Sequence, residues 1–377
     1  MKRYQAILTM VVAALSLLGV SCTLWRHPPV VETEMVPDTF RVTSPCIDRF
    51  MEEVEYTDDD YTVSHILDYP GGGPGDEDIP PAVHLGWEQV GAAKVRLLEL
   101  PDTAWSWDYA VPKDSSCIDI YNLIPQRDYA YIVLGADGDT LKHGLFHTIG
   151  TLHQAFLRPA VRNSRDLGGW KTQDGRTVAY RKLYRCGKII GEDFTSVYIN
   201  KAGREDARAL GIGAELDLRE EGKMPDYSPL GPGVTFCAPG FPLGGTTMLG
   251  KYQPQVAQSF HFIVRSLHEG RGVLFHCSAG RDRTGTMAAL LLGVLGVSEG
   301  DIGKEYELTY FAPKGYSMYS KYPDEYYHTR INGIQNSCRY IRKKYKNSSF
   351  QEGCEKYLLE IGVSEREIED FKNLVLQ

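Results

Sequence analysis

The chain has 377 residues, a length that accommodates two medium-sized domains with short additional segments. Hydrophobic residues make up 42% and charged residues 24%, the composition of an ordinary globular protein. Lysine and arginine number 41 against 49 aspartates and glutamates, so the formal net charge is −8. This balance argues against nucleic acid as the main partner, because a phosphate backbone is bound by a basic surface.

The start of the chain has the pattern of an export signal. Lys2 and Arg3 precede an apolar run over 6–20, which is too short to span a bilayer comfortably. The run stops just before Cys22, and this junction resembles a bacterial lipoprotein processing site, at which the cysteine is acylated. We predict a signal peptide over 1–22, a lipid anchor on Cys22, and a periplasmic, outer-membrane or secreted bacterial protein. A plain secretory signal or an uncleaved anchor is the alternative.

Residues 23–45 contain several prolines and are predicted to be an irregular linker. An acidic stretch follows over 52–60 and 76–78, and we expect it to be a solvated loop. An exported location permits disulfides among the remaining cysteines. Cys46 and Cys117 would form a plausible bridge, and buried free thiols are the alternative.

Residues 46–150 are predicted to form an all-β sandwich. Short alternating strands are expected near 81–87, 94–100 and 129–134, with turn residues between them. The segment from Leu123 to Tyr129 (LIPQRDY) resembles the corner of fibronectin type III domains, where the tyrosine hydroxyl bonds back to the main chain. Trp87 stands where such domains carry a core tryptophan. The resemblance implies a fibronectin III-like or immunoglobulin-like domain with a role in spacing or docking.

Residues 151–377 show a different pattern, in which strands and helices alternate. Buried strands are expected within 210–218 and at 273–276, and helices over 255–268 and 283–297. Alternating strands and helices indicate an α/β domain. The basic residues of the helical tail after 330 are interpreted as a solvated helix face.

A short loop between a strand and a helix carries the chemistry of this domain. It reads His276-Cys277-Ser278-Ala279-Gly280-Arg281-Asp282-Arg283-Thr284-Gly285. Such a loop directs several backbone N–H groups into one concavity, and the helix dipole adds positive potential there. Ala279 and Gly280 are small, so the backbone can approach a ligand closely. The pattern predicts a phosphate site built from residues 278–283.

Cys277 is the predicted nucleophile. Cations and helix N-termini lower cysteine pKa values from about 8.5 to roughly 3.5–7.5, so a thiolate is expected at neutral pH. The guanidinium of Arg283 can grip two phosphate oxygens, and Thr284 can donate to the sulfur. His276 is expected to orient the loop. A buried cysteine beside a capping arginine would be the structural alternative.

This loop resembles the signature of the protein tyrosine phosphatase superfamily. More narrowly, it is similar to the bacterial tyrosine/phosphoinositide phosphatase family, whose loop reads His-Cys-x-x-Gly-Lys-Asp-Arg-Thr-Gly. Further similar blocks are 163–169, 183–187 and 216–219, so the resemblance covers residues 155 to 377. It implies a mostly parallel central sheet flanked by helices and no metal or other cofactor. Two positions differ: Arg281 replaces the family lysine and Cys186 replaces a serine.

The leaving group needs a proton donor. No Asp or Glu occurs between 237 and 247, where many tyrosine phosphatases carry a general acid, and the resemblance points instead to Asp282 inside the loop. Asp226, in a Pro-Asp pair, is the second candidate, and a purely structural ion pair of Asp282 with Arg219 or another arginine is the alternative. Arg165, Asp166 and Arg219 are expected to support the loop, or to form structural salt bridges.

Two functions therefore compete. The first is a cysteine-dependent phosphomonoesterase acting through a phosphocysteine on phosphotyrosine, phosphoinositide or another phosphorylated molecule. The second is a non-catalytic phosphate-recognition lipoprotein in which the sandwich provides the biological role. An intact cysteine, arginine and aspartate in one loop favour the enzyme. Because an exported thiolate is exposed to oxidation, Cys186 or Cys237 could serve as a reversible disulfide partner of Cys277.

Overall fold

The computed structural model describes residues 38–56, 79–88, 91–101, 105–189, 199–220, 227–312 and 333–377. The chain divides into two compact units. Unit 1 contains Met1–Val42 and Pro81–Gly150, and unit 2 contains Thr43–Pro80 and Thr151–Gln377. The predicted export signal with Cys22 lies outside the described residues. Within those residues, no helix is both long and apolar enough to cross a membrane.

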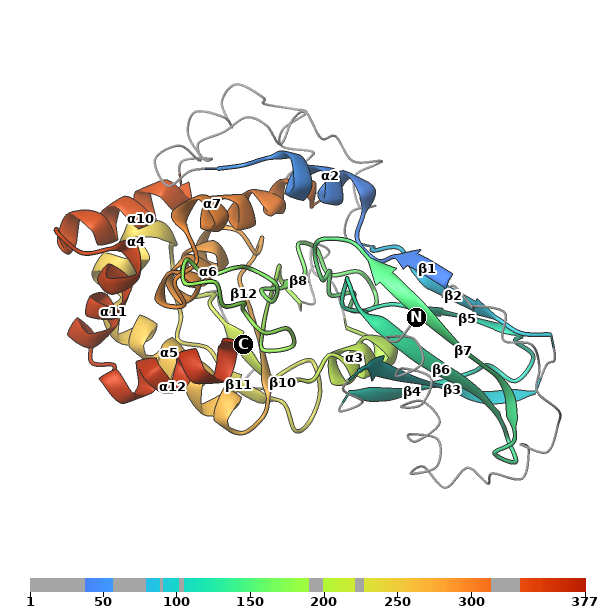
Figure 1. The fold of residues 1–377 in the computed structure, drawn as a ribbon. Coiled ribbons are helices and arrows are strands. Elements are labelled where there is room, and N and C mark those ends of the chain that lie inside the picture. Colours follow the sequence, from blue (N-terminus) through green and yellow to red (C-terminus); the bar gives the residue numbers. More distant parts are fainter. Residues whose placement is uncertain are drawn as a thin grey trace, which may run out of the picture. The chain divides into compact units, whose positions relative to one another are not determined.

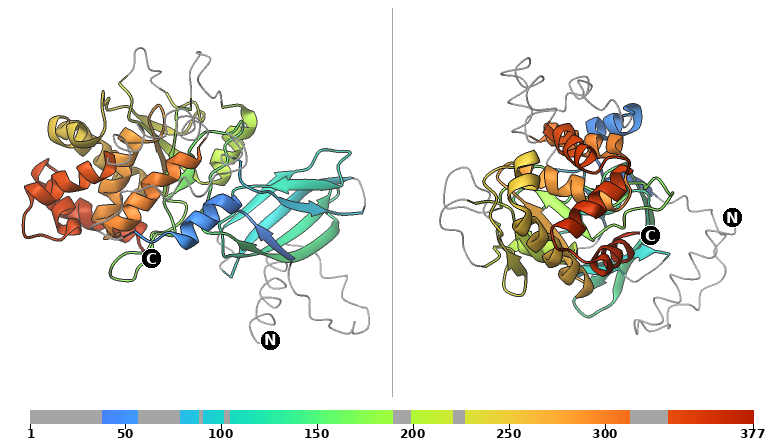
Figure 2. Two further views of the ribbon diagram at one scale, coloured as in Figure 1. Left: turned by 90° about the horizontal axis from the view of Figure 1, so that it is seen from above. Right: turned by 90° about the vertical axis from the view of Figure 1, so that its left-hand side faces the viewer.

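The described elements of unit 1 are all strands. They are β1 (Asp38–Arg41), β2 (Val83–Gly86), β3 (Ala92–Leu100), β4 (Ser106–Ala110), β5 (Cys117–Ile120), β6 (Asp128–Gly135) and β7 (Thr140–Ile149). Five of them form a sheet in the order β1-β7-β6-β3-β4, and β2 pairs with β5 in a second sheet (Figures 1 and 2). All these pairs are antiparallel except β1 with β7, which is parallel.

The apolar residues of the two sheets share one core. Val83 on β2, Ile120 on β5 and Val95 on β3 are all fully buried in the same cluster, which also contains Trp87. The alternation of apolar and polar residues therefore marks the inward faces correctly. At the predicted corner, the backbone N–H of Ile124 donates to the hydroxyl of Tyr129 at 3.0 Å. The likeness to fibronectin type III domains stays a prediction.

Two features near the N-terminus differ from the expected domain boundaries. Strand β1 lies within the predicted linker 23–45 and pairs with β7, because extended backbone there completes the edge of the sheet. The start of the predicted sandwich 46–150 is instead a helix, α2 (Pro45–Glu53), that belongs to unit 2. Pro45 at the first turn favours a helix start. Cys117 in unit 1 is a free thiol, so it forms no bridge with Cys46.

Unit 2 is an α/β domain. Its strands are β8 (Arg165–Asp166), β9 (Leu183–Cys186), β10 (Ile212–Asp217), β11 (Thr235–Cys237) and β12 (Gly272–His276), arranged in the order β11-β10-β12-β9-β8. Strands β11, β10, β12 and β9 run parallel, whereas β8 is antiparallel to β9. The expected mostly parallel sheet is therefore corrected to a mixed one, because β8 and β9 are joined by a chain reversal instead of a crossover.

Helices cover both faces of this sheet. They are α3 (Lys201–Ala209), α4 (Gly245–Lys251), α5 (Gln253–His268), α6 (Asp282–Val294), α7 (Glu299–Glu307), α10 (Gly333–Lys344), α11 (Phe350–Glu360) and α12 (Glu365–Val375), with the 3₁₀ helix η4 at Leu308–Phe311. Val273 and Phe275 of β12 pack into the larger core with α4–α7 and α10–α12, whereas Leu274 packs on the other side with α3. Both faces are buried, as a parallel sheet requires.

Helix α2 packs against α7 within unit 2, and the two lie side by side in Figures 1 and 2. Phe50 is fully buried in the main core, and the Lys304 ammonium donates to the carbonyls of Met51 (2.6 Å) and Val54 (2.5 Å). Tyr56 adds a hydrogen bond to Glu307. The segment 43–56, which precedes most of unit 1 in sequence, is therefore a structural part of the α/β domain.

This packing predicts that Phe50→Ala destabilises unit 2. Truncating a fully buried phenylalanine typically costs about 3–5 kcal/mol. The measurement is chemical denaturation of the full chain, followed through the unfolding of the α/β domain. Arg49→Ala is the matched control on the same helix, because that side chain is 60% exposed and should cost within about 0.5 kcal/mol of zero. Equal stability of the two variants would contradict the assignment of α2 to unit 2.

Candidate active site

The loop 276–285 joins β12 to α6 at the carboxyl end of the sheet. Strand β12 lies between β10 and β9, and every one of its residues is buried. Helix α6 is buried along almost its whole length, which explains its alanine- and leucine-rich sequence. In open α/β sheets, ligands bind outside the carboxyl ends of the strands. The loop is therefore fixed on both sides by buried elements.

Three successive carbonyl groups of the loop are held from behind. The carbonyl of Ser278 accepts from the N–H of Lys188 at 3.2 Å. The carbonyls of Ala279 and Gly280 accept from the Asn163 side-chain amide at 3.3 and 2.7 Å. In a trans peptide the C=O and the following N–H point in opposite directions. The N–H groups of residues 279, 280 and 281 consequently point to the opposite side, where they form an anion-binding concavity.

Gly280 is required by the strand beside the loop. Its φ is +67°, and an added Cβ would lie 2.5 Å from the carbonyl oxygen of Cys186 on β9. Both the backbone conformation and the close approach exclude a side chain. The sequence predicted a small residue at position 280 so that a ligand could approach the backbone. In the structure, glycine is needed there because the loop contacts strand β9.

Buried charges support the loop from the same side. Glu305 on α7 accepts from Arg165 Nε at 2.8 Å and from Arg185 Nη1 at 2.5 Å, and all three side chains are at most 3% exposed. Arg185 also donates to the carbonyl of Gly280. The three side chains carry a net charge of +1, which adds positive potential behind the anion site. Burial of such a cluster is costly unless each charge is paired, as it is here.

Cys277 lies at the floor of the concavity and is 2% exposed. Burial alone raises the pKa of its thiol, but the hydrogen bond from Thr284 and the charge of Arg283 outweigh it, so the pKa of Cys277 lies below the ordinary range of a thiol. The carboxylate of Asp282 opposes the shift.

The two arginines of the loop play different structural parts. Arg283 Nη1 donates to the carbonyl of Phe241 and Nη2 donates to Ser278 Oγ, both at 2.9 Å, which directs its fork across the loop. Arg281 is buried and pairs with both carboxylate oxygens of Asp282, at 3.1 and 3.2 Å. Asp282 is also an acceptor for the Tyr306 hydroxyl at 3.3 Å, and its side chain remains 55% exposed.

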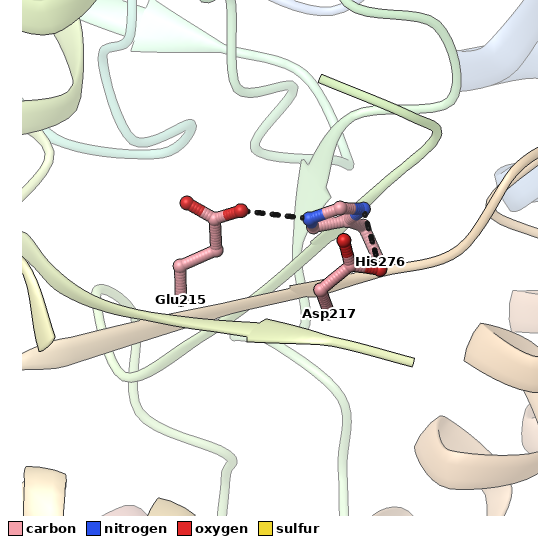
Figure 3. A group of neighbouring side chains, drawn as sticks. All are labelled: Glu215, Asp217 and His276. Atoms are coloured by element: carbon pink, nitrogen blue, oxygen red, sulfur yellow. Dashed lines mark hydrogen bonds and ion pairs between the residues drawn. The ribbon is translucent and has the colours of Figure 1, made fainter. Parts of the chain in front are cut away.

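His276 sits beneath the loop between two carboxylates (Figure 3). Its Nε2 lies 3.0 Å from Glu215 and its Nδ1 lies 3.9 Å from Asp217. Burial lowers the pKa of His276, but Asp217 and Glu215 outweigh it, so the pKa is raised. The arrangement of Glu215, Asp217 and His276 does not suit a metal ion. The two carboxylates face opposite edges of the ring, and Asp217 is already held by Arg219 at 2.6 Å.

A cavity of about 400 Å³ adjoins the loop. Asp282 and Arg283 are the charged residues that line it among those described. The other lining residues are uncharged: Pro242, Leu243, Gly244, Gly245, Thr246, Thr247, Thr286, Tyr306, Ile334 and Asn336. Leu243 is 61% exposed, so part of this wall is apolar and accessible. The cavity can receive the organic part of a ligand whose anionic group occupies the loop.

The predicted supporting residues behave differently from one another. Arg165 reaches the loop through Asn163 and Glu305. Asp166 instead accepts from the N–H groups of Gly168 (2.8 Å) and Arg181 (2.7 Å), which lie outside the loop. Arg219 pairs with Asp217, which lies beside His276, so Arg219 supports the loop indirectly. The arginine that pairs with Asp282 is Arg281. The predicted donor Asp226 lies outside the described residues.

Four residues without a role predicted from the sequence also hold the loop: Asn163, Arg185, Glu215 and Glu305. The first two lie in the similar blocks 163–169 and 183–187. Arg185 gave a signal, because it is a charged residue in an otherwise apolar strand, and such a residue must find a buried partner. Glu305 gave no such signal in the sequence, since an acidic residue on a helix is usually solvated. Its role depends on the packing of α7 beside β8 and β9, where it meets Arg165 and Arg185.

The cysteines expected as disulfide partners of Cys277 are poorly placed. Cys186 packs in the core on the face of the sheet opposite to that of Cys277. Cys237 lies on β11, two strands away from β12, which corresponds to about 9–10 Å between strand axes. Cα atoms more than about 7 Å apart cannot be bridged without backbone movement.

Comparison with known proteins assigns the family. The model described as "Tyrosine phosphatase family" matches residues 158–238 and 244–377, more than half of the chain. "Putative tyrosine-protein phosphatase H16_A0669" of Cupriavidus necator is 28% identical over 51% of this chain and 70% of its own length. A tyrosine-protein phosphatase of Nostoc commune is 30% identical over 46% and 69%. Pseudomonas aeruginosa TpbA overlaps 50% of this chain and 96% of its own at 14% identity, with a TM-score of 0.29. The two sequence relatives and the family model show that this chain belongs to the tyrosine phosphatase family and is a hydrolase of the protein-tyrosine-phosphatase type.

Proposed function

We propose that the protein hydrolyses phosphomonoesters through a phosphocysteine intermediate at Cys277. The thiolate attacks phosphorus, an S–P bond forms, and the bond to the leaving oxygen breaks. Water then attacks the phosphocysteine, the S–P bond breaks, and phosphate leaves with the thiolate restored. The observation that carries this proposal is the combination of a lowered Cys277 pKa with three N–H groups and Arg283 at one loop. These donors stabilise charge on the transferring group.

Asp282 is the proposed proton donor and acceptor. It is the acidic residue of the loop, it lines the cavity, and its exposure lets it reach a leaving oxygen and later a water molecule. Its hydrogen bond from Tyr306 and its ion pair with Arg281 hold it at the rim. Asp226 remains the second candidate.

We propose phosphotyrosine, and not an inositol phospholipid, as the substrate class. A substrate with further phosphates would need a further cation at the loop, but the guanidinium of Arg281 is paired with Asp282. The cavity wall formed by Pro242, Leu243 and Ile334 suits an aromatic ring better than a ring carrying further phosphates. A phosphotyrosine peptide and a phosphoinositide assayed at equal concentration test this choice, and faster release of phosphate from the lipid would reverse it.

The cell-envelope location is a proposal from the sequence of residues 1–22. A lipid on Cys22 would anchor the chain to a membrane, and unit 1, if it is a fibronectin III-like domain, would separate the catalytic unit from the surface. Globomycin sensitivity of the precursor and metabolic labelling with palmitate test the anchor, with Cys22→Ser as the control.

The proposal predicts turnover without metal. The wild-type protein should hydrolyse p-nitrophenyl phosphate in EDTA and reductant, and Cys277→Ser should lose at least about 10³-fold in kcat, because the hydroxyl does not ionise at neutral pH. The measurement is release of p-nitrophenol. Bound phosphate without any turnover in the reduced wild type would instead support a phosphate-recognition module.

The lowered pKa of Cys277 predicts the effect of Thr284→Val. Activity needs the thiolate, so it falls as the pH drops below that pKa. Loss of a hydrogen bond to the charged sulfur destabilises the thiolate and should raise the pKa of Cys277. The acidic limb of kcat/KM then moves to higher pH, and iodoacetamide inactivation shifts with it. An unchanged limb in the folded variant would contradict a bond from Thr284 to the sulfur.

The pH profile also separates the two candidate proton donors. Asp282→Asn should remove the basic limb of kcat/KM and lower kcat by about 10²–10⁴-fold for a poor leaving group. Asp226→Asn is the matched control and should keep both limbs. If only Asp226→Asn loses the basic limb, the assignment of Asp282 is wrong.

A further inference from the structure

Glu305 lies outside the phosphate loop, yet two chains of hydrogen bonds connect it to a single loop atom. In the first, Glu305 accepts from Arg185, whose other guanidinium nitrogen donates to the carbonyl of Gly280. In the second, Glu305 accepts from Arg165, which donates to the Asn163 side-chain oxygen. The amide nitrogen of Asn163 donates to the same Gly280 carbonyl at 2.7 Å. One carboxylate thus orients both donors to this carbonyl.

The Gly280 carbonyl determines where the next N–H points. Because the peptide is planar and trans, a carbonyl held behind the loop turns the N–H of Arg281 into the concavity. Gly280 has no side chain to restrict its own backbone. Its φ is +67°, and a glycine can adopt other backbone conformations about as readily. The orientation of this peptide therefore depends on its external hydrogen bonds.

We propose that Glu305 is a positioning residue for phosphate binding, which acts by fixing Arg185 and, through Arg165, Asn163 against the Gly280 carbonyl. It does not touch the phosphate. The inference rests on the proposed function only in taking the loop as the phosphate site.

A purely electrostatic role for Glu305 would have the opposite effect. Glu305 carries a negative charge behind an anion site, so its neutralisation would increase the positive potential and strengthen phosphate binding. Loss of positioning instead lets the Gly280 peptide rotate, removes one N–H donor from the concavity and weakens binding. Glu305→Gln keeps the shape of the side chain and separates the two roles by the sign of the change.

The experiment measures binding of inorganic phosphate by isothermal titration calorimetry, with the full-length reduced protein. We expect Glu305→Gln to weaken binding by tenfold or more. Glu299→Gln is the control, because Glu299 is also buried on α7 and ion-paired, with Arg342 as its partner, yet lies at the far end of the helix. It should bind phosphate within twofold of the wild type even if its stability falls. Unchanged or tighter binding by folded Glu305→Gln would overturn the proposal.

A second variant covers the case in which Glu305→Gln does not fold. Arg185→Lys keeps the buried charge but cannot make both bonds of the guanidinium fork. Positioning predicts weaker phosphate binding in this variant, whereas a role of charge alone predicts no change, which would overturn the proposal. Because phosphate binding is measured without turnover, a failure of the Glu305 proposal can be distinguished from a failure of the proposed function. A wild type that fails to bind phosphate defeats that function, whereas normal binding by the wild type and both variants defeats only the role of Glu305.

Discussion

The site depends on one constraint, the orientation of three successive peptides in the loop after β12. Their carbonyls are held from behind by Lys188 and Asn163, with Arg185 as a further donor to Gly280, so their N–H groups face the ligand. A backbone pre-arranged in this way needs no reorganisation when charge moves onto the transferring group. The lowered pKa of Cys277 and the direction of the Arg283 fork have the same origin, because both follow from the path of this loop.

That orientation requires polar groups to be buried where a core would normally be apolar. Arg165, Arg185 and Glu305 are all excluded from water, and a single unpaired member would cost several kcal/mol. The helix that carries Glu305 is itself held on its other side by α2, through Lys304 and Tyr56. The segment 43–56, which precedes most of unit 1 in the chain, thus contributes to the rigidity of unit 2.

The loop also places two groups with different chemical requirements, Cys277 and Asp282, at different depths. The sulfur of Cys277 needs cations and protection from water, and it lies at the floor with 2% exposure. A group that exchanges protons with a leaving oxygen and with water needs access, and Asp282 lies at the rim with more than half of its side chain exposed. Arg281 and Tyr306 hold Asp282 in place there. Position within one short loop therefore suits these two acidic groups to the different tasks that the proposed function gives them.

The sequence by itself determined several local features: strands such as β3, β6, β10 and β12, the helices α5 and α6, the strand–loop–helix context of Cys277, and the residue types that bind phosphate. Those features depend on periodicity and on neighbours in the chain, which a sequence displays. Only the tertiary structure decided that α2 joins unit 2, that β8 makes the sheet mixed, and that Glu305 and Asn163 support the loop. The places of α2, Glu305 and Asn163 depend on contacts between residues more than 100 positions apart, and the pairing of β8 with β9 joins residues about 20 positions apart. Such contacts are chosen by the packing of whole elements.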